Sequence, residues 1–206
     1  MAEKPIQRKE RERLRHRQEI LDISLKLFSE LGFNNVSMQQ IADKSEFSVG
    51  TLYNFFESKD TLFEELINST SSKVLSEFLE ILDGPGNEKD RLWAFIRHQP
   101  KFLEKYGNIL KLYISEMGIK TFKLFKFRDV NKVYEVVDLK LSQIIRQGIE
   151  KGTFRSVDPE IAGKTLGSVL ERLILETEGL CDKDAIIDKF KKVEQLFLEG
   201  LLQPKG

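Results

Sequence analysis

Hydroxyl and amide side chains at predicted helix starts are the residues whose types and spacing indicate a chemical role. Ser37 and Gln40 stand three apart, so each side chain can satisfy a free backbone N–H of the other, as in a capping box. Ser48 can cap a further helix after a break at 45–47. Two short helices over 37–44 and 48–55, joined by a tight turn, predict a helix-turn-helix. In that motif the first helix lies across the DNA backbone and the second enters the major groove.

The elements that must position this motif are predicted to be helical. An amphipathic helix precedes it, and Gly32 reads as the residue that ends this helix. Apolar residues inside the motif set the angle between its two helices: Ile41, Ala42, Phe47 and Leu52. Ser58 caps a fourth helix, which runs until Gly84-Pro85-Gly86 ends it.

The rest of the chain also has helical periodicity and no confident strand. One helix starts near Asn87 and is expected to kink at Pro100, and another covers 108–117. A long helix stops at Gly152, and Asp158-Pro159 is a strong start signal for the next one. With a last helix at the C-terminus, the fold class is all-α with about nine helices.

Composition excludes several other classes of protein. The 206 residues are 40% hydrophobic and 32% charged, a balance typical of a globular, non-membrane chain. The longest apolar run, 92–96, is far too short to span a bilayer, and no secretory signal is visible, so a cytoplasmic location is expected. One cysteine and two distant histidines do not make a zinc cage, and the common catalytic motifs are missing. We therefore expect no enzyme activity, no metal and no cofactor.

Charge is distributed unevenly although the chain has 33 basic and 33 acidic residues. From Met1 to Arg17 there are seven bases and three acids, giving 7 − 3 = +4. A basic arm beside a helix-turn-helix is typical of a chain that contacts a polyanion. Arg13, Arg15 or Arg17 could touch phosphate or the minor groove, or the arm could be a solvated helix extension.

The residues themselves resemble a family. Val36-Ser-Met-Gln-Gln-Ile-Ala42, Phe47-Ser-Val-Gly-Thr-Leu-Tyr-Asn-Phe-Phe56 and Ser58-Lys-Asp-Thr-Leu62 are similar to the DNA-binding head of TetR-type (TetR/AcrR) transcriptional repressors. The resemblance covers about the first quarter of the chain. It implies a DNA-binding domain over 1–60, with its basic arm, and an effector-binding and dimerisation domain over 61–206.

The resemblance also implies which side chains meet DNA. Ser37 and Lys59 would bind phosphates, Ser48, Gly50 and Thr51 would face base edges, and Tyr53 and Asn54 would bind phosphate or the groove wall. The full predicted set is Arg17, Ser37, Gln39, Lys44, Ser48, Val49, Gly50, Thr51, Tyr53, Asn54 and Lys59. Because 45–56 contains no Lys or Arg, base reading would rely on hydroxyls, an amide and contact with thymine methyls.

One position departs from the family pattern. Where the family usually has Ala-Gly in the turn, this chain has Ser45-Glu46. If Glu46 adopts the left-handed conformation, it costs roughly 1–2 kcal/mol relative to glycine. Its charge would also repel phosphate.

The body is expected to hold a small-molecule effector and a twofold interface. An effector pocket would be lined by Trp93, Phe102, Tyr106, Tyr113, Met117, Tyr134 and Arg172. Arg172 could anchor an anionic ligand, or could instead pair with Glu176 one turn away. The last two helices are apolar on more than one side, which predicts a homodimer through Leu166, Val169, Leu173, Phe190, Val193 and Phe197.

The predicted function is a repressor that binds a palindromic operator as a homodimer and is released by a small, apolar or aromatic effector. Two other classes stay open. One is a helical ligand-binding or scaffold protein whose DNA-binding head has decayed. Glu46 and the absence of charge in the second helix of the motif, 48–55, favour this alternative. The other is a small helical enzyme, which the sequence disfavours because nothing pairs a nucleophile with a base.

Overall fold

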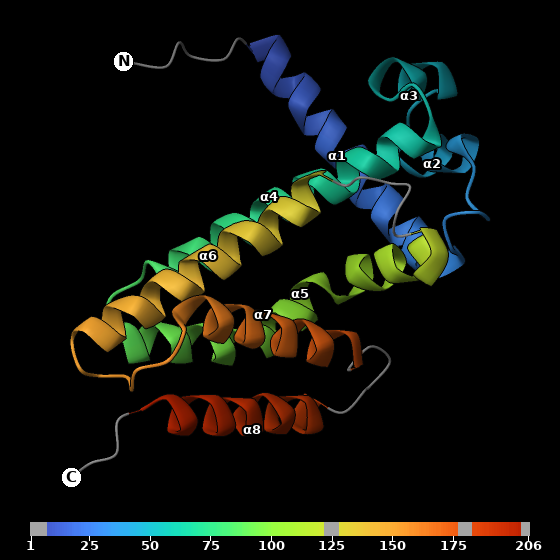
Figure 1. Ribbon diagram of the computed structural model, residues 1–206. Coiled ribbons are helices and arrows are strands. Elements are labelled where there is room, and N and C mark those ends of the chain that lie inside the picture. The colour runs from blue at the N-terminus through green and yellow to red at the C-terminus, as the bar shows by residue number, and fades with distance from the viewer. Residues whose placement is uncertain (1–7, 122–127, 177–182, 203–206) are drawn as a thin grey trace. The chain divides into compact units, whose positions relative to one another are not determined.

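The computed structural model describes residues 8–121, 128–176 and 183–202. Within them the chain is helical, apart from an isolated bridge between Phe154 and Leu202, which confirms the all-α class. The helices of this described part are α1 (Arg8–Leu31), α2 (Met38–Lys44), α3 (Val49–Phe55), α4 (Lys59–Leu82), α5 (Glu88–Thr121), α6 (Arg128–Glu150), α7 (Pro159–Glu176) and α8 (Lys183–Leu201) (Figure 1).

The chain divides into two compact units. The N-terminal unit comprises Met1–Ser69 with Asn108–Lys126, and the C-terminal unit comprises Thr70–Gly107 with Phe127–Gly206. Helices α4 and α5 each contribute residues to both units. The functional division at residue 60 stays a prediction.

Helix α5 is one helix where the sequence predicts two. It runs from Glu88 to Thr121 with Pro100 inside it, although an interior proline costs about 3 kcal/mol or more. Burial offsets this cost, because each fully buried large apolar side chain contributes about 1.5–3 kcal/mol. The buried stripe of α5 on either side of the proline is Leu92, Phe95, Ile96 and Phe102. The described residues accordingly form eight helices instead of the nine expected.

Local stop and start signals act where the sequence places them. Gly32 follows α1 with φ 82°, and its N–H donates to the Phe28 carbonyl at 2.8 Å. Asp158 caps α7, since its Oδ1 accepts from the backbone N–H groups of Glu160 at 2.9 Å and Ile161 at 3.0 Å. Gly152 ends the turn after α6 with φ 73°. These predicted boundaries are confirmed.

The N-terminal unit has its own core, enclosed by α1, α2, α3 and the start of α4 (Figure 1). Residues at helical spacing on each of these elements are almost fully buried: Ile20, Phe28, Ile41, Leu52 and Leu62. Phe28 and Phe33 add an aromatic contact with ring centroids 5.2 Å apart. This core holds the two short helices of the motif in a fixed relation to α1.

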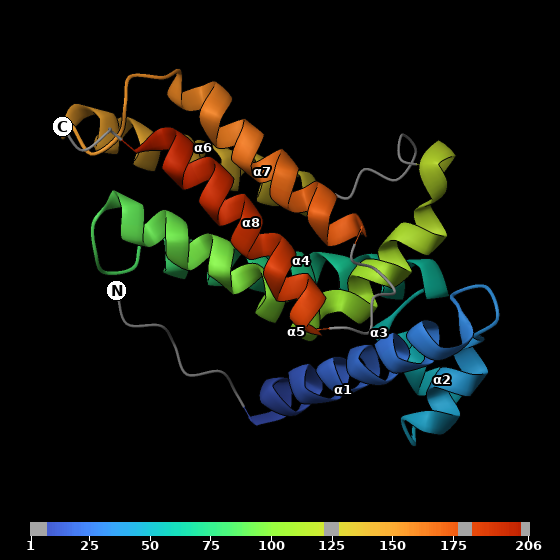
Figure 2. The ribbon, with the colours of Figure 1, turned by 90° about the horizontal axis from the view of Figure 1, so that it is seen from below.

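In the C-terminal unit α6 and α7 lie side by side in both views (Figures 1 and 2). Their close approach depends on two glycines of α7. A Cβ at Gly163 would lie 2.4 Å from Ser142 Oγ, and one at Gly167 would lie 2.5 Å from Asp138 Oδ1. The helix that these glycines admit at close range is α6 of the same chain.

Candidate nucleic-acid interface

The start of α2 is organised by Ser37. Its backbone N–H donates to Gln40 Oε1 at 2.8 Å, and the Gln40 N–H donates to Ser37 Oγ at 3.2 Å. The predicted capping box is confirmed. Gln39 and Lys44 of the same helix are exposed, and the Gln39 amide donates to Asp43 at 2.7 Å.

The turn after α2 is a Schellman motif. The Phe47 N–H donates to the Ala42 carbonyl at 3.0 Å, and the Glu46 N–H donates to the Asp43 carbonyl at 3.4 Å. This geometry requires a left-handed residue, and Glu46 has φ 59°, the one non-glycine of the described residues with positive φ. The left-handed Glu46 anticipated from the sequence is therefore present, at a position where glycine is unstrained. Its carboxylate is exposed.

Helix α3 is capped by Ser48, as predicted. Ser48 Oγ accepts from the Thr51 N–H at 3.0 Å and lies 2.8 Å from Thr51 Oγ1, so the two hydroxyls also bond to each other. Leu52 is the buried residue of this helix. Gly50 and Asn54 are exposed, and Tyr53 is 52% exposed. The structure thus brings the predicted base-reading residues together on one short helix and its cap, with Leu52 packed inward.

No contact within the described protein requires residue 50 to be glycine. A Cβ at this position would meet nothing closer than Ser48 Oγ, at 3.9 Å. Glycine inside a helix costs about 0.5–1 kcal/mol relative to alanine. The missing side chain therefore leaves space outside the protein, where a ligand backbone or base can approach.

Two predicted phosphate ligands are engaged inside the unit. Arg17 forms a two-pronged ion pair with Glu65 and donates to the Phe55 carbonyl at 2.9 Å, and hydrogen bonding to Glu65 raises the pKa of Arg17. The Lys59 Nζ donates to the carbonyls of Phe33 and Val36, both at 2.8 Å. These contacts fasten α1 and α4 to the motif, so both cations have partners within the protein, and their contact with phosphate stays a prediction.

Sequence reasoning missed Glu65, which orients Arg17. Its signal is a carboxylate on the same stretch of α4 as the buried Leu62 and Leu66, where an amphipathic helix normally carries apolar residues. A half-buried carboxylate at such a position requires a cation nearby.

The motif itself is not positively charged. Between Val36 and Lys59 there are two bases and three acids, giving 2 − 3 = −1. A net electrostatic attraction to DNA must therefore come from residues outside it, such as those of the basic start of α1.

Of the predicted effector residues of the body, Phe102 and Tyr106 contact each other. Phe102 is buried between Phe78 and Tyr106, with ring centroids 5.1 and 5.3 Å apart. Trp93 is half-buried under the Lys89 ammonium, 3.9 Å from its ring centroid. Tyr134 is 41% exposed. The side chains of Tyr113 and Met117 lie outside the described residues.

A polar cluster joins α4 to α5 beside these aromatics. The Glu77 carboxylate accepts from His98 Nε2 at 2.8 Å, Lys105 Nζ at 2.8 Å and the Tyr106 hydroxyl at 2.9 Å. Burial opposes the charge of Glu77, but these hydrogen bonds outweigh it and its pKa is lowered. The bond to Glu77 raises the pKa of Lys105 to about 12. His98 is therefore a polar contact of Glu77.

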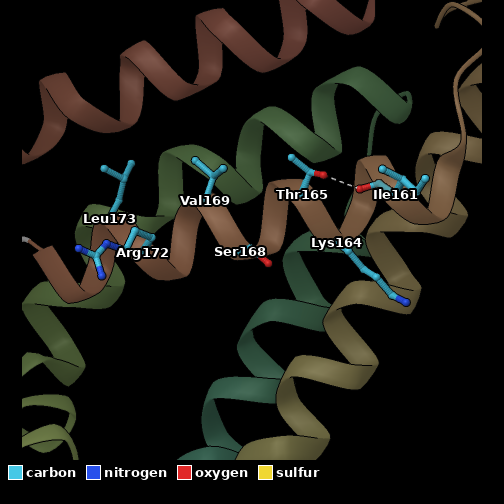
Figure 3. A pocket seen from close by; sticks show the side chains of 7 residues that line it. All are labelled: Ile161, Lys164, Thr165, Ser168, Val169, Arg172 and Leu173. Atoms are coloured by element: carbon cyan, nitrogen blue, oxygen red, sulfur yellow. Dashed lines mark hydrogen bonds between the residues drawn. The ribbon is translucent and has the colours of Figure 1, made fainter. Parts of the chain in front are cut away.

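A groove of about 540 Å³ lies along the outer side of α7 (Figure 3). Its lining consists of Ile161, Lys164, Thr165, Ser168, Val169, Arg172 and Leu173. Arg172 Nε donates to Glu176 Oε1 at 2.8 Å, so the ion-pair alternative describes this arginine in the structure. Val169 is 37% exposed.

The predicted interface residues divide into two groups. Leu166 and Phe190 are buried in the core of their own unit, at 0% and 2% exposure, and are not available at its surface. Helix spacing could not separate the two sides of α7 and α8, because both are apolar. The residues that stay partly exposed are Val169, Leu173, Val193 and Phe197.

Known proteins resemble this chain in both sequence and structure. A family model of bacterial regulatory proteins of the tetR family matches residues 20–66. The transcriptional repressor KstR2 of Rhodococcus jostii is 23% identical over 153 residues, which is 73% of this chain and 74% of that protein. The fatty acid degradation regulator FadR of Bacillus halodurans superposes with a TM-score of 0.73 at 17% identity over 97% of this chain and 98% of its own. FadR of Bacillus subtilis, solved in complex with stearoyl-CoA, has a TM-score of 0.69 at 17% identity, covering 89% and 98%.

A capped, exposed helix held behind a tight turn in an all-α chain defines a helix-turn-helix DNA-binding protein. The matched family model covers that motif, and the relatives regulate transcription. Residues 20–66 therefore carry the DNA-binding domain of the tetR family, and the chain as a whole resembles transcriptional regulators of the TetR/AcrR family. In the described residues no helix has the length and apolarity needed to cross a membrane.

Proposed function

We propose that this protein is a ligand-responsive repressor that binds a palindromic operator as a homodimer and releases it when a small apolar or aromatic effector binds. The observation that carries this proposal is the open space at Gly50 on a capped, exposed α3. A glycine that costs stability without an internal contact is expected where a duplex must come close. A protein that binds operator DNA in this way would act in the cytoplasm.

Base reading would be carried by α3. Thr51, Ser48 and Asn54 offer hydroxyls and an amide, and Val49 offers methyl groups for thymine. A guanine contact by a bidentate arginine is not available on this helix, since 45–56 contains no Lys or Arg. Sequence discrimination would therefore depend on adenine edges, which an asparagine amide can read, and on thymine methyls more than on guanine.

A homodimer through α7 and α8 is supported by their exposed apolar side chains. Ile161 and Leu196 are 66% and 79% exposed, and Val169 and Leu173 line the groove on α7. A second copy would cover them, and its twofold axis would present two recognition helices to half-sites about 34–36 Å apart or a multiple of that.

The effector would bind in the body, over 61–206, and act through α4 and α5, which belong to both units. The stearoyl-CoA bound by Bacillus subtilis FadR supports an effector with a large apolar part. Coupling is reciprocal: an effector that weakens operator binding is itself bound less tightly by the operator complex.

The test is a titration of the protein against the DNA upstream of its own gene, with fluorescence anisotropy as the readout at several salt concentrations. The proposal expects binding much tighter than to random duplex, a protected inverted repeat in a footprint, and a dimer by light scattering. Binding no tighter than to random DNA would instead favour a ligand-binding or scaffold protein with a decayed head. Trp93, the single tryptophan, reports effector binding by its fluorescence.

A further inference from the structure

The first turns of α1 form a basic helical arm, Arg8–Arg15. Every residue of the arm is exposed, and the first buried residue of α1 is Ile20. The arm contains five bases and two acids, giving 5 − 2 = +3, whereas the motif from Val36 to Lys59 has a charge of −1. Because it is helical, the arm presents its side chains in fixed directions.

Two contacts determine which side of α1 faces the motif. The His16 ring packs edge-on against Phe47, with centroids 5.2 Å apart, just before α3 begins. Arg17 donates to the Phe55 carbonyl at the end of α3 and lies 4.4 Å from the centroid of the Phe56 ring. This side of α1 is therefore turned toward both ends of the recognition helix.

Helix geometry extends that side along the arm. Residues four and eight before Arg17 lie on the same face, and these are Arg13 and Lys9. Arg15 stands two residues before Arg17, which at 3.6 residues per turn is about half a turn away. Arg11, four before Arg15, shares that opposite face. The arm thus has one basic face beside α3 and another turned away from it.

We propose that Lys9 and Arg13 form a phosphate clamp, which binds backbone phosphates of the duplex next to the groove that α3 enters. This inference rests on the proposed DNA-binding function and names residues that neither the recognition helix nor its caps include. Duplex DNA carries one negative charge per about 1.7 Å, so a helical row of cations along its backbone is complementary to it. The clamp supplies affinity and orientation, and base discrimination stays with α3.

The experiment compares two double variants of the full-length protein that remove the same charge. Lys9→Gln with Arg13→Gln should weaken binding to operator and to random duplex by a similar factor, on the order of tenfold or more. It should also make the plot of log affinity against log salt less steep by roughly 0.9 for each lost contact in each protomer. Arg11→Gln with Arg15→Gln should leave the slope unchanged within error. Arg13→Lys should retain the wild-type slope, because a phosphate needs only a point charge.

The outcomes separate this inference from the proposed function. Equal losses in both double variants would mean that the arm acts only through its total charge, and no loss in either would mean that it does not touch DNA; both results overturn the clamp. A wild-type protein that does not bind its operator overturns the proposed function and the clamp with it. Circular dichroism of each variant verifies that α1 keeps its helical content.

Discussion

Arg17 and Glu65 join α1 to α4 through two parallel hydrogen bonds, with the Arg17 and Glu65 side chains 28% and 34% exposed. The same guanidinium reaches the carbonyl of Phe55, the last residue of α3. One ion pair therefore holds the recognition helix against the two long helices of its unit. Arg17, which is predicted to bind DNA, thus positions the helix whose residues are predicted to read the bases.

Replacing Glu65 by Gln should destabilise the protein and weaken operator binding together. The half-buried Arg17 loses its charged partner, and we expect the unfolding free energy to fall by about 1–2 kcal/mol after allowance for solvent screening. Thermal unfolding measures the effect. The matched control is Glu12→Gln, which breaks the exposed Arg8–Glu12 pair and should leave the melting temperature unchanged. Equal shifts for both variants would contradict a special role for Glu65.

Replacing Glu46 by Gly should stabilise the protein and tighten operator binding. Glycine relieves the left-handed strain, for an expected gain of roughly 1–2 kcal/mol, and removes a negative charge near phosphate. Glu46→Gln separates the two effects, since it should raise affinity with little gain in stability. Denaturant titration and anisotropy are the measurements, and a less stable Glu46→Gly variant would show that the turn does not need a left-handed residue.

Replacing Gly50 by Ala should move stability and DNA binding in opposite directions. The new methyl has open space, so helix propensity should raise the unfolding free energy by about 0.5–1 kcal/mol. On DNA the same methyl would occupy the surface that faces the bases, and operator affinity should fall. Unchanged affinity in the anisotropy titration would remove the main support for α3 as the reading helix.

Replacing Gly163 by Ala should destabilise the C-terminal unit, since its Cβ would lie 2.8 Å from the backbone nitrogen of Ser142. Overpacking of this kind costs about 1–3 kcal/mol. Gly200 of α8 is the matched control, because a Cβ there would meet nothing within 4 Å and alanine should stabilise by about 0.5–1 kcal/mol. Thermal melts of opposite sign are expected, and two shifts of the same sign would be inconsistent with the α6–α7 contact.

Asp138 should make stability depend on pH. Burial raises the pKa of Asp138, and nearby Glu171 adds to the rise while Lys164 opposes it. A raised pKa means that the folded state holds this proton more tightly, so its contribution to stability is complete below the ordinary aspartate value of about 3.9 and is lost as pH rises through the folded pKa. Asp138→Asn should therefore raise the melting temperature at pH 7 more than at pH 3. A gain that does not vary with pH would exclude this explanation.

The sequence by itself determined the features that depend on near neighbours along the chain. The Ser37 capping box, the Ser48 and Asp158 caps and the end of α1 at Gly32 each involve backbone groups no more than four residues apart. Such interactions are written in residue type and spacing, which is why the helix-turn-helix and the strained turn could be predicted.

Tertiary structure alone decided the features that join distant segments. Arg17 meets Glu65 across 48 residues, and Lys59 reaches the Phe33 carbonyl across 26, so both cations have partners that lie far away in the sequence. Packing also buried Leu166 and Phe190 in the core of their own unit, and α5 continues past Pro100 as one helix. Periodicity states that a helix has an apolar face, but which neighbour covers that face depends on long-range contacts that spacing does not encode.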